Sequence, residues 1–177
     1  RTVMSYYLSR GISIYFVDDI LNVANLMKVV RPTIMTAVPR LLEKIFNKIK
    51  TQISQKPFIS RMIASFAFSY ALKENMNKNS ILFKIYDKVV YSKFREIFGS
   101  RVEKLVSGGA PLSKEIAQFF VNIGVPIYQG YGMTEFSPVV STNYPNANKV
   151  GSCGKVIPSA KIKITENNEL LVRGDSL

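Results

Sequence analysis

The sequence predicts an α/β fold built on a parallel sheet, with a long helical insertion and a short β segment near the C-terminal end. Three observations lead to this prediction. Strand–helix–strand alternations occupy residues 12–38 and 104–128. The stretch between them, about residues 41–100, keeps a helical periodicity, and after residue 145 short strands alternate with glycine and proline. Alternating strands and helices are typical of parallel sheets.

The first alternation begins with an apolar run at residues 12–17, which predicts a buried strand. Asp19 is placed to cap a helix whose apolar residues are Ile20, Val23, Met27 and Val30. This helix should end at Arg31-Pro32, because the residue before a proline is pushed out of the helical conformation. Residues 33–38 are then predicted to form a second buried strand.

Three helical stretches are predicted in the insertion. Pro39 opens the first, at a position of the first turn that tolerates proline. Its apolar face comprises Leu41, Leu42, Ile45, Phe46, Ile49 and Ile53. The second helical stretch is marked by Met62, Ile63, Phe66, Ala67 and Tyr70, and the third by Ile81, Ile85 and Val89 with Tyr86 and Val90. Such an insertion is much longer than an ordinary connection between neighbouring strands.

The second alternation starts with a strand at residues 104–106 that leads into the turn 107–112. Ser113 caps a helix, Gly124 ends it, and residues 125–128 form the next strand. The apolar face of this helix comprises Ile116, Phe119, Phe120 and Ile123.

The last part of the chain is predicted to be β-rich. Residues 160–165 and 169–173 flank Glu166-Asn167-Asn168, a pattern that predicts a hairpin. We therefore place a boundary between residues 1–145 and residues 146–177. Both ends of the chain look cut, because residue 1 begins as though within a helix and residue 177 follows a strand-like run directly.

The composition excludes several kinds of chemistry. The chain of 177 residues has no histidine and a single cysteine, Cys153. It can therefore form no internal disulfide, no zinc site of the usual ligands and no Ser-His-Asp or Cys-His catalytic group. A single cysteine favours a reducing compartment, so we expect a cytoplasmic location. No run reaches the roughly 18–20 apolar residues of a membrane span, and the first residues do not resemble a secretory signal.

The formal net charge of +12 is concentrated in the middle of the chain. Residues 40–104 hold fourteen basic and five acidic residues. One explanation is a solvated helical surface, and another is peripheral contact of the basic helices with an anionic membrane. Nucleic-acid binding is not expected, since no binding motif accompanies the charge. A basic membrane- or nucleic-acid-binding module without catalysis is nevertheless an alternative that the composition permits.

Two glycine-containing turns follow two of the predicted strands, and ligands of open α/β sheets bind at the carboxyl ends of strands. Gly108-Gly109-Ala110 has so little side-chain bulk that a flat ligand could lie against its backbone. Gly130-Tyr131-Gly132 presents an aromatic ring whose stacking on a base is worth on the order of 1–3 kcal/mol. Thr134 offers a hydroxyl to a phosphate oxygen, and the Glu135 carboxylate suits Mg²⁺. Each feature alone has a structural explanation, but their combination predicts a nucleotide site.

Three segments of the chain resemble the ordered signatures of the AMP-forming, or adenylate-forming, synthetase superfamily. They are residues 107–112, residues 129–135 and residues 150–155. The superfamily contains acyl-CoA synthetases, luciferases and the adenylation domains of peptide synthetases. The bacterial-type long-chain fatty acyl-CoA synthetases fit best, because Gln129, the run at residues 38–44 and the long helical insertion are similar to that branch.

This resemblance implies a fold and an activity. Residues 1–145 would belong to the α/β adenylation core of the large N-terminal domain, with its parallel-sheet sandwich, and residues 146–177 would begin the β-rich subdomain of the same domain. The enzyme would activate a long-chain fatty acid with ATP and Mg²⁺ to acyl-AMP, and would transfer the acyl group to coenzyme A. Its partners would be the fatty acid, ATP and coenzyme A. Other adenylate-forming enzymes, which act on short-chain, aryl or amino acids, remain an alternative.

The resemblance also implies residue roles. The nucleotide-binding set comprises Gly109, Ala110, Gln129, Gly130, Tyr131, Gly132, Met133 and Thr134. Tyr131 would stack on adenine, while Gly109 and Ala110 would border the adenine and the acyl pocket. Thr134 and Glu135 are the catalytic candidates: Thr134 would bind the α-phosphate and Glu135 would hold the metal.

Parts that the superfamily uses are missing from this sequence. It contains no Gly-rich, lysine-containing phosphate loop, and the small C-terminal domain with its catalytic lysine is absent. Asp175 lies too close to the end of the last predicted strand to be taken as the aspartate that binds the ribose hydroxyls. We therefore expect these 177 residues by themselves to be inactive.

Overall fold

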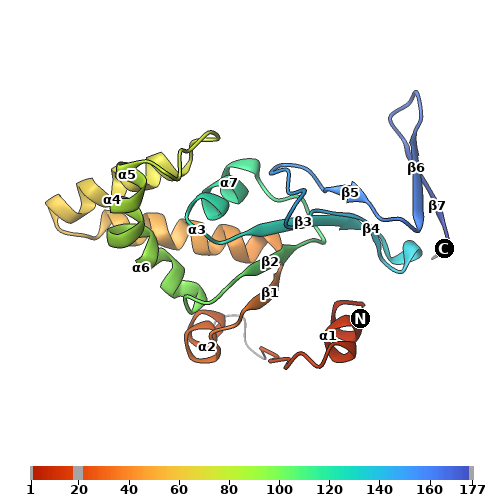
Figure 1. The fold of residues 1–177 in the computed structure, drawn as a ribbon, viewed down its shortest axis with the longest axis horizontal. Helices are drawn as coiled ribbons and strands as arrows, with labels where there is room; N and C mark the ends of the chain where they lie inside the picture. Colours follow the sequence, from red (N-terminus) through yellow and green to blue (C-terminus); the bar gives the residue numbers. More distant parts are fainter. Residues whose placement is uncertain (1, 18–21, 176–177) are drawn as a thin grey trace.

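A computed structural model describes residues 2–17 and 22–175. Its centre is a five-stranded sheet in the order β1-β2-β3-β4-β5 (Figure 1). The strands are β1 (Ile34–Ala37), β2 (Lys104–Ser107), β3 (Ile127–Gly132), β4 (Val139–Thr142) and β5 (Lys155–Val156). The first three strands are parallel, and β4 and β5 continue the sheet in antiparallel fashion. The α/β class predicted from the sequence is confirmed.

Helices precede and separate these strands. They are α1 (Thr2–Ser9), α2 (Val23–Val30), α3 (Pro39–Ser54), α4 (Phe58–Ala71), α5 (Ile81–Tyr86), α6 (Ser92–Arg95) and α7 (Lys114–Asn122). A π-helical turn, η2 (Asp87–Tyr91), joins α5 to α6, and the 3-10 turn η3 (Glu96–Phe98) follows α6. The helical insertion is therefore confirmed, with Pro39 in the first turn of α3. As predicted, α2 stops before Pro32, and Arg31 ends it in the left-handed conformation at φ 49°.

The strand predicted at residues 12–17 is wrong. This run has no regular structure, and the side chains of Tyr15 and Phe16 are largely exposed. An apolar run becomes a strand only where a neighbour accepts its backbone hydrogen bonds, and none of the described strands pairs with it. The predicted cap Asp19 and the apolar Ile20 lie outside the described residues.

The main core lies where α3, α4 and α7 meet the sheet. Phe46 of α3, Phe68 of α4 and Phe119 of α7 form an aromatic cluster with ring centroids 4.7–5.2 Å apart. Such pairs add to the free energy of burial of the rings. The predicted apolar face of α3 is confirmed, because Leu42, Ile45, Phe46, Ile49 and Ile53 are all buried and Leu41 packs against them.

The second and third helical stretches predicted in the insertion are present, but only some of the apolar residues that mark them are buried. In α4 the buried residues are Ala64, Ala67, Phe68 and Ala71, whereas the predicted Met62, Ile63 and Phe66 are exposed. In α5 and η2 the predicted Ile81, Ile85 and Val89 are exposed, whereas Val90 and Tyr91 are buried. Both elements have apolar residues on two sides, so periodicity alone could not select the inward one. The three alanines of α4 leave room for close approach of its neighbours.

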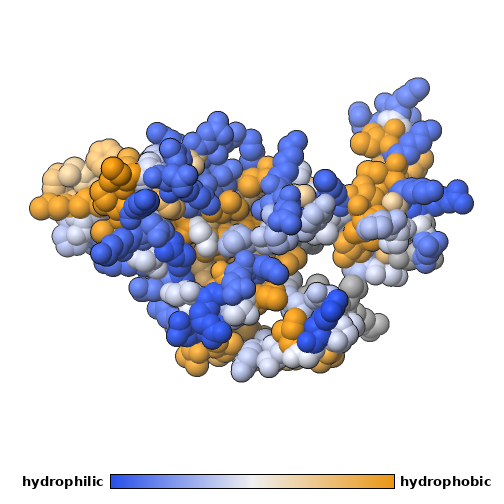
Figure 2. Space-filling model, viewed as in Figure 1, coloured by the Kyte–Doolittle hydropathy of each residue, from blue (hydrophilic) through white to orange (hydrophobic). Residues whose placement is uncertain are grey.

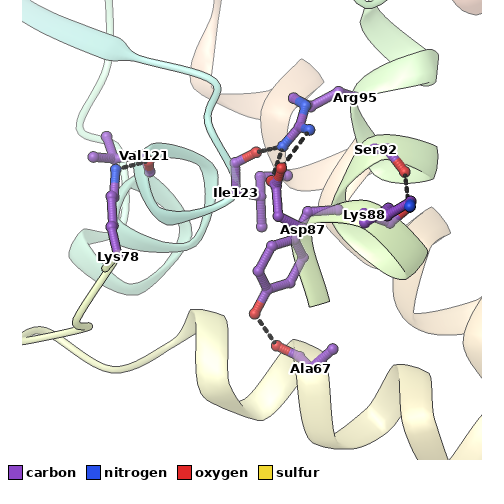
Figure 3. A network of polar contacts seen from close by, with 9 residues as sticks. Ala67, Lys78, Asp87, Lys88, Ser92, Arg95, Val121 and Ile123 are labelled. Carbon is purple, nitrogen blue, oxygen red and sulfur yellow. Dashed lines mark hydrogen bonds and ion pairs between the residues drawn. The ribbon is translucent and has the colours of Figure 1, made fainter. Parts of the chain in front are cut away.

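A polar network ties the insertion to α7 (Figure 3). The Tyr91 hydroxyl donates to Ala67 O at 2.8 Å, and burial raises the pKa of this phenol above its ordinary value. Arg95 pairs with Asp87 at 2.5 Å and donates to Ile123 O at 2.8 Å. Lys78 donates to Val121 O at 3.0 Å, and burial lowers the pKa of its ammonium group. The first of these bonds joins η2 to α4, and the other two hold the insertion against the end of α7.

The C-terminal part contains the predicted hairpin. Its strands are β6 (Ala160–Ile164) and β7 (Leu170–Gly174), which pair in a separate two-stranded sheet (Figure 1). A small second core of Phe136, Val140 and Ala160 joins the hairpin to β4. Across the described part of the chain, no helix has the length and apolar character of a membrane span.

Candidate functional site

The two glycine-containing turns lie side by side. Ser107 at the end of β2 is in register with Gln129 of β3, and both strands run in the same direction. A Cβ atom placed on Gly108 would lie 3.6 Å from the carbonyl oxygen of Gly130. The turns are separated by about twenty residues in the sequence, but they share the carboxyl edge of the parallel strands. Binding sites of open α/β sheets form at this edge.

Two buried polar atoms at this edge have no hydrogen-bond partner among the described residues. They are Ser107 Oγ and Gln129 Oε1, in side chains that are 0% and 9% exposed. Leaving a buried polar atom unpaired costs about 1–3 kcal/mol. Because aligned residues of neighbouring strands face the same side of a sheet, the two atoms mark one place where a further polar group would be bound.

The end of β3 is held by close contact with the start of β4. A Cβ atom on Gly132 would lie 1.9 Å from Pro138 O, and Met133 N donates to that same oxygen at 2.8 Å. On Gly130, a Cβ atom would lie 3.2 Å from Ser141 O. Gly132 is therefore required by the approach of the neighbouring backbone, whether or not a ligand is bound, whereas a side chain at Gly130 would need a shift of only a few tenths of an ångström.

Between these glycines, Tyr131 presents its ring outward and is 39% exposed. The following 3-10 turn, η4 (Thr134–Phe136), is anchored by Phe136, which is only 1% exposed. Burial of Phe136 leaves Thr134 and Glu135 exposed on the outer side of the turn. The aromatic ring, the hydroxyl and the carboxylate thus lie within five consecutive residues on the accessible side of the site.

The first turn is open where a ligand would approach. Gly109 has a φ of +84°, a conformation that favours glycine, and no atom lies within 4 Å of the place of its absent Cβ. Ala110 is exposed. The predicted site residues are therefore grouped on two adjoining turns: Gly109 and Ala110 on the first, and Gln129 to Glu135 on the second.

Asn143 is a supporting residue that the sequence prediction missed. It is buried, and its amide nitrogen donates to Gln129 O at 3.0 Å and to Ser152 O at 2.6 Å. Its amide oxygen accepts from Lys149 N at 2.9 Å. Asn143 thus fastens the loop carrying the third sequence signature to the end of β3. It stands in a polar segment, where an asparagine is usual, so no pattern marked it.

Ser107 lies within the first signature, but the sequence does not mark it as a site residue. Its only distinguishing feature in the sequence is a hydroxyl at the end of a predicted strand, and serine is common wherever a strand leads into a turn. Only the pairing with Gln129 shows that both side chains are buried at one place.

Glu135 is suited to act as a single carboxylate ligand of Mg²⁺. It is exposed, and within residues 2–17 and 22–175 no ion pair engages it and no three His, Cys, Asp or Glu side chains gather. Mg²⁺ is commonly held by one or two carboxylates together with substrate phosphates and water. A single exposed carboxylate beside the Thr134 hydroxyl fits that arrangement.

Two cavities lie elsewhere in the structure. One of about 390 Å³ borders Arg95, Arg101 and Gly124, at the amino ends of β2 and β3. The other, of about 770 Å³, is a groove between residues 12–17 and β1. Neither is lined by a residue of the three signatures.

Comparison with known families assigns the chain. Residues 1–176 match the family described as AMP-binding enzyme, and the chain belongs to this family. It is 32% identical over 169 residues to the long-chain-fatty-acid–CoA ligase FadD15 of Mycobacterium bovis, covering 92% of this chain and 28% of that protein. It is 33% identical over 150 residues to the long-chain-fatty-acid–CoA ligase ACSBG2 of Xenopus laevis, covering 81% and 20%. The chain thus spans about a quarter of the length of these relatives.

Solved structures share the fold. The anthranilate CoA ligase AuaEII in complex with anthranoyl-AMP has a TM-score of 0.57 at 19% identity, over 94% of this chain and 27% of that one. The N-terminal domain of FACL13 from Mycobacterium tuberculosis has a TM-score of 0.57 at 16% identity, over 99% and 37%. At these identities the likeness establishes the adenylate-forming fold alone.

Proposed function

We propose that this chain supplies part of the adenylate-forming site of a long-chain fatty acid–CoA ligase. The names of its relatives and its membership of the AMP-binding family support the reaction class. The observation that carries the assignment of the site is the unpaired, buried Ser107 Oγ and Gln129 Oε1 at the ends of parallel strands, beside the exposed Thr134–Glu135 turn.

Each group at this edge has a proposed role. Tyr131 stacks on the adenine, and Gly109 and Ala110 border the adenine and the acyl pocket. Thr134 donates its hydroxyl to the α-phosphate. Glu135 ligates Mg²⁺, which would neutralise phosphate charge when bound. The backbone and side chains from Gln129 to Met133 line the cleft for the nucleotide and the substrate carboxylate.

The proposed reaction has two steps. A carboxylate oxygen of the fatty acid attacks the α-phosphorus of ATP, the bond to the β-phosphate oxygen breaks, and pyrophosphate leaves. The thiol of coenzyme A then attacks the acyl carbon of acyl-AMP, AMP leaves, and the thiol proton is released. The residues of this chain act in the first step by positioning the nucleotide and by stabilising charge.

We further propose that residues 1–145 and 146–177 belong to one large domain of a longer, cytoplasmic enzyme. The span of about 28% of FadD15 supports a longer enzyme, and the single cysteine, Cys153, suits a reducing compartment such as the cytoplasm. The sequence also lacks the Gly-rich phosphate loop that the superfamily uses. The 177 residues alone should therefore show no turnover. A clear fatty-acid-dependent ATP–pyrophosphate exchange by this polypeptide would refute that proposal.

The half-reactions of the full-length enzyme provide the test of the site. Glu135→Ala should reduce ATP–pyrophosphate exchange far more than it reduces thioester formation from supplied acyl-AMP, because only the first step needs the metal-bound triphosphate. Equal loss in both half-reactions would contradict the role of Glu135. A panel of long-chain, short-chain, aryl and amino acids tests the substrate class, and preference for any class other than long-chain acids would overturn that part of the proposal.

A further inference from the structure

The run at residues 129–135 is attached to the rest of the structure at two points. Its far end is fixed where Gly132 packs against Pro138 O. Its near end is Gln129, the last residue of β3 that pairs with β2. Between these points the pairing of β3 with β4 shifts register, after Tyr131. The attachment at Gln129 therefore influences directly how the residues that follow it are oriented.

Asn143 makes the attachment at Gln129. The carbonyl oxygen of Gln129 accepts two hydrogen bonds from this one residue, from its backbone nitrogen and from its side-chain nitrogen, each at 3.0 Å. Asn143 directly follows β4, whose Thr142 is in register with Gly130. A carbonyl oxygen has two lone pairs, and here both have a donor. The plane of the peptide that joins Gln129 to Gly130 is thus fixed from one side by Asn143.

The side chain of Asn143 is fully engaged within the protein. It is 4% exposed, its second amide N–H donates to Ser152 O at 2.6 Å, and its amide oxygen accepts from Lys149 N at 2.9 Å. Both donors and the acceptor oxygen of a primary amide are therefore in use. Any rotation of this side chain would leave a buried polar atom unpaired, so it keeps one orientation and holds Gln129 O in one place.

The loop between β4 and β5 is held in the same way. Every residue from 144 to 154 is at least partly exposed, and Figure 2 shows mainly hydrophilic residues between α7 and β5, where this loop lies. Asn148 of the loop donates to Ile127 O at 2.9 Å, which lies before the run at residues 129–135. Asn143, in contrast, bonds to the run itself.

We propose that Asn143 is a positioning residue for adenylate formation and acts through the peptide of Gln129. By fixing this peptide, Asn143 sets the direction of the Gln129 side chain, whose Oε1 is buried and unpaired, and the place of the Tyr131 ring. Its own side chain is occupied by protein groups and does not contact substrate. The inference rests on the function proposed for this site, and it adds a residue that lies outside the three sequence signatures.

The nucleotide affinity of the full-length enzyme tests this role. Asn143→Ala removes both side-chain donors. Asn143→Asp keeps the size of the side chain and the acceptor for Lys149 N, but it turns a carboxylate oxygen toward the carbonyl oxygens of Gln129 and Ser152. Both variants should weaken ATP binding about tenfold in calorimetry. Both should raise the KM for ATP in ATP–pyrophosphate exchange by a similar factor, with a smaller change in kcat.

Asn122→Ala is the matched structural control. Asn122 is 3% exposed and likewise donates to two backbone carbonyl oxygens, Ala71 O and Lys73 O, each at 2.8 Å. The alanine variants at Asn143 and Asn122 should both lower the denaturant midpoint of the protein. Only the variant at Asn143 should change the ATP affinity and the KM for ATP. Asn148→Ala, which frees the same loop from β3 at an earlier residue, should also keep the parental values.

Amide hydrogen exchange provides a readout that needs no nucleotide. Exchange within residues 129–133 should be faster in Asn143→Asp than in the parent and unchanged in Asn122→Ala. If Asn143→Ala does not fold, the isosteric Asn143→Asp and this measurement still decide the matter. Parental ATP affinity or parental exchange in Asn143→Asp would overturn the proposal, and so would an equal loss of affinity in Asn122→Ala. A parent enzyme that binds no ATP would overturn the proposed function of the site, and this inference with it.

Discussion

Gly132 offers a sharp test of how the site is built. An added methyl group would lie 1.9 Å from Pro138 O, and ordinary contact begins near 3.4 Å, so the strands must separate by about 1.5 Å. That separation would also stretch the bond from Met133 N to Pro138 O, now 2.8 Å long. Overpacking costs about 1–3 kcal/mol and the lost hydrogen bond costs about 1 kcal/mol. We therefore expect Gly132→Ala to lower the free energy of unfolding of the domain by about 2–4 kcal/mol.

The same displacement should impair adenylate formation. Thr134 and Glu135 follow Gly132 directly, and a shift of about 1 Å in a positioned group can lower a rate by roughly a hundredfold. ATP–pyrophosphate exchange and denaturant unfolding of the full-length enzyme measure the two effects. The reasoning would be refuted if Gly132→Ala had the unfolding free energy and exchange rate of the parent.

Gly108→Ala is the matched control. Its Cβ would lie at an ordinary 3.6 Å from Gly130 O, and the φ of Gly108 is not positive. Its unfolding free energy should stay within about 0.5 kcal/mol of the parental value. If this stable variant binds nucleotide more weakly, the added methyl group must contact the nucleotide beside the turn. Strong destabilisation would show that the spacing between the two turns is tighter than the structure indicates.

Three further predictions concern single side chains. Tyr131→Ala should weaken nucleotide binding about tenfold in calorimetry while Tyr131→Phe preserves it, since the ring stacks without its hydroxyl; unchanged affinity in the alanine variant would count against stacking. Asn122 donates to Ala71 O and Lys73 O at 2.8 Å, so Asn122→Ala should lower the unfolding free energy by about 2–4 kcal/mol. Gln118→Ala removes only one bond, to Asn122, and should lower it by about 1 kcal/mol. Equal losses in the two variants would contradict this prediction. Burial raises the folded-state pKa of Tyr91, so the contribution of this phenol to stability is complete below its unfolded-state pKa near 10 and is lost as pH rises above that value. The difference in unfolding free energy between the parent and Tyr91→Phe should therefore shrink above pH 10. A difference that stays constant with pH would refute this prediction.

In the helical insertion, the sequence predicts the buried side of only one helix. The apolar face of α3 was predicted correctly, because its other side is polar and only one side could be buried. For α4 both sides are apolar, so the pattern does not say which side is buried. The structure buries the side that carries Ala64, Ala67 and Ala71. Periodicity reports that a face is apolar, but the space available beside a helix decides which face turns inward.

The strand predicted at residues 12–17 is absent for a different reason. Its composition is that of a buried strand, yet pairing is a property of two segments, and the described part of the chain supplies no second one. Asn143 is the converse case. Nothing in its neighbourhood in the sequence distinguishes it, and its importance arises because Gln129, Lys149 and Ser152 meet at its side chain.

The sequence by itself determined the α/β class, the helical insertion, the C-terminal hairpin and the family of this chain. These depend on local patterns and on ordered motifs, which are written in consecutive residues. Only the tertiary structure decided that Ser107 and Gln129 lie together with unpaired polar atoms, that Gly132 is required by Pro138, and that α4 and α5 turn their bulky residues outward. Each of these depends on contacts between segments distant in the sequence, and such contacts are fixed by packing and by strand pairing.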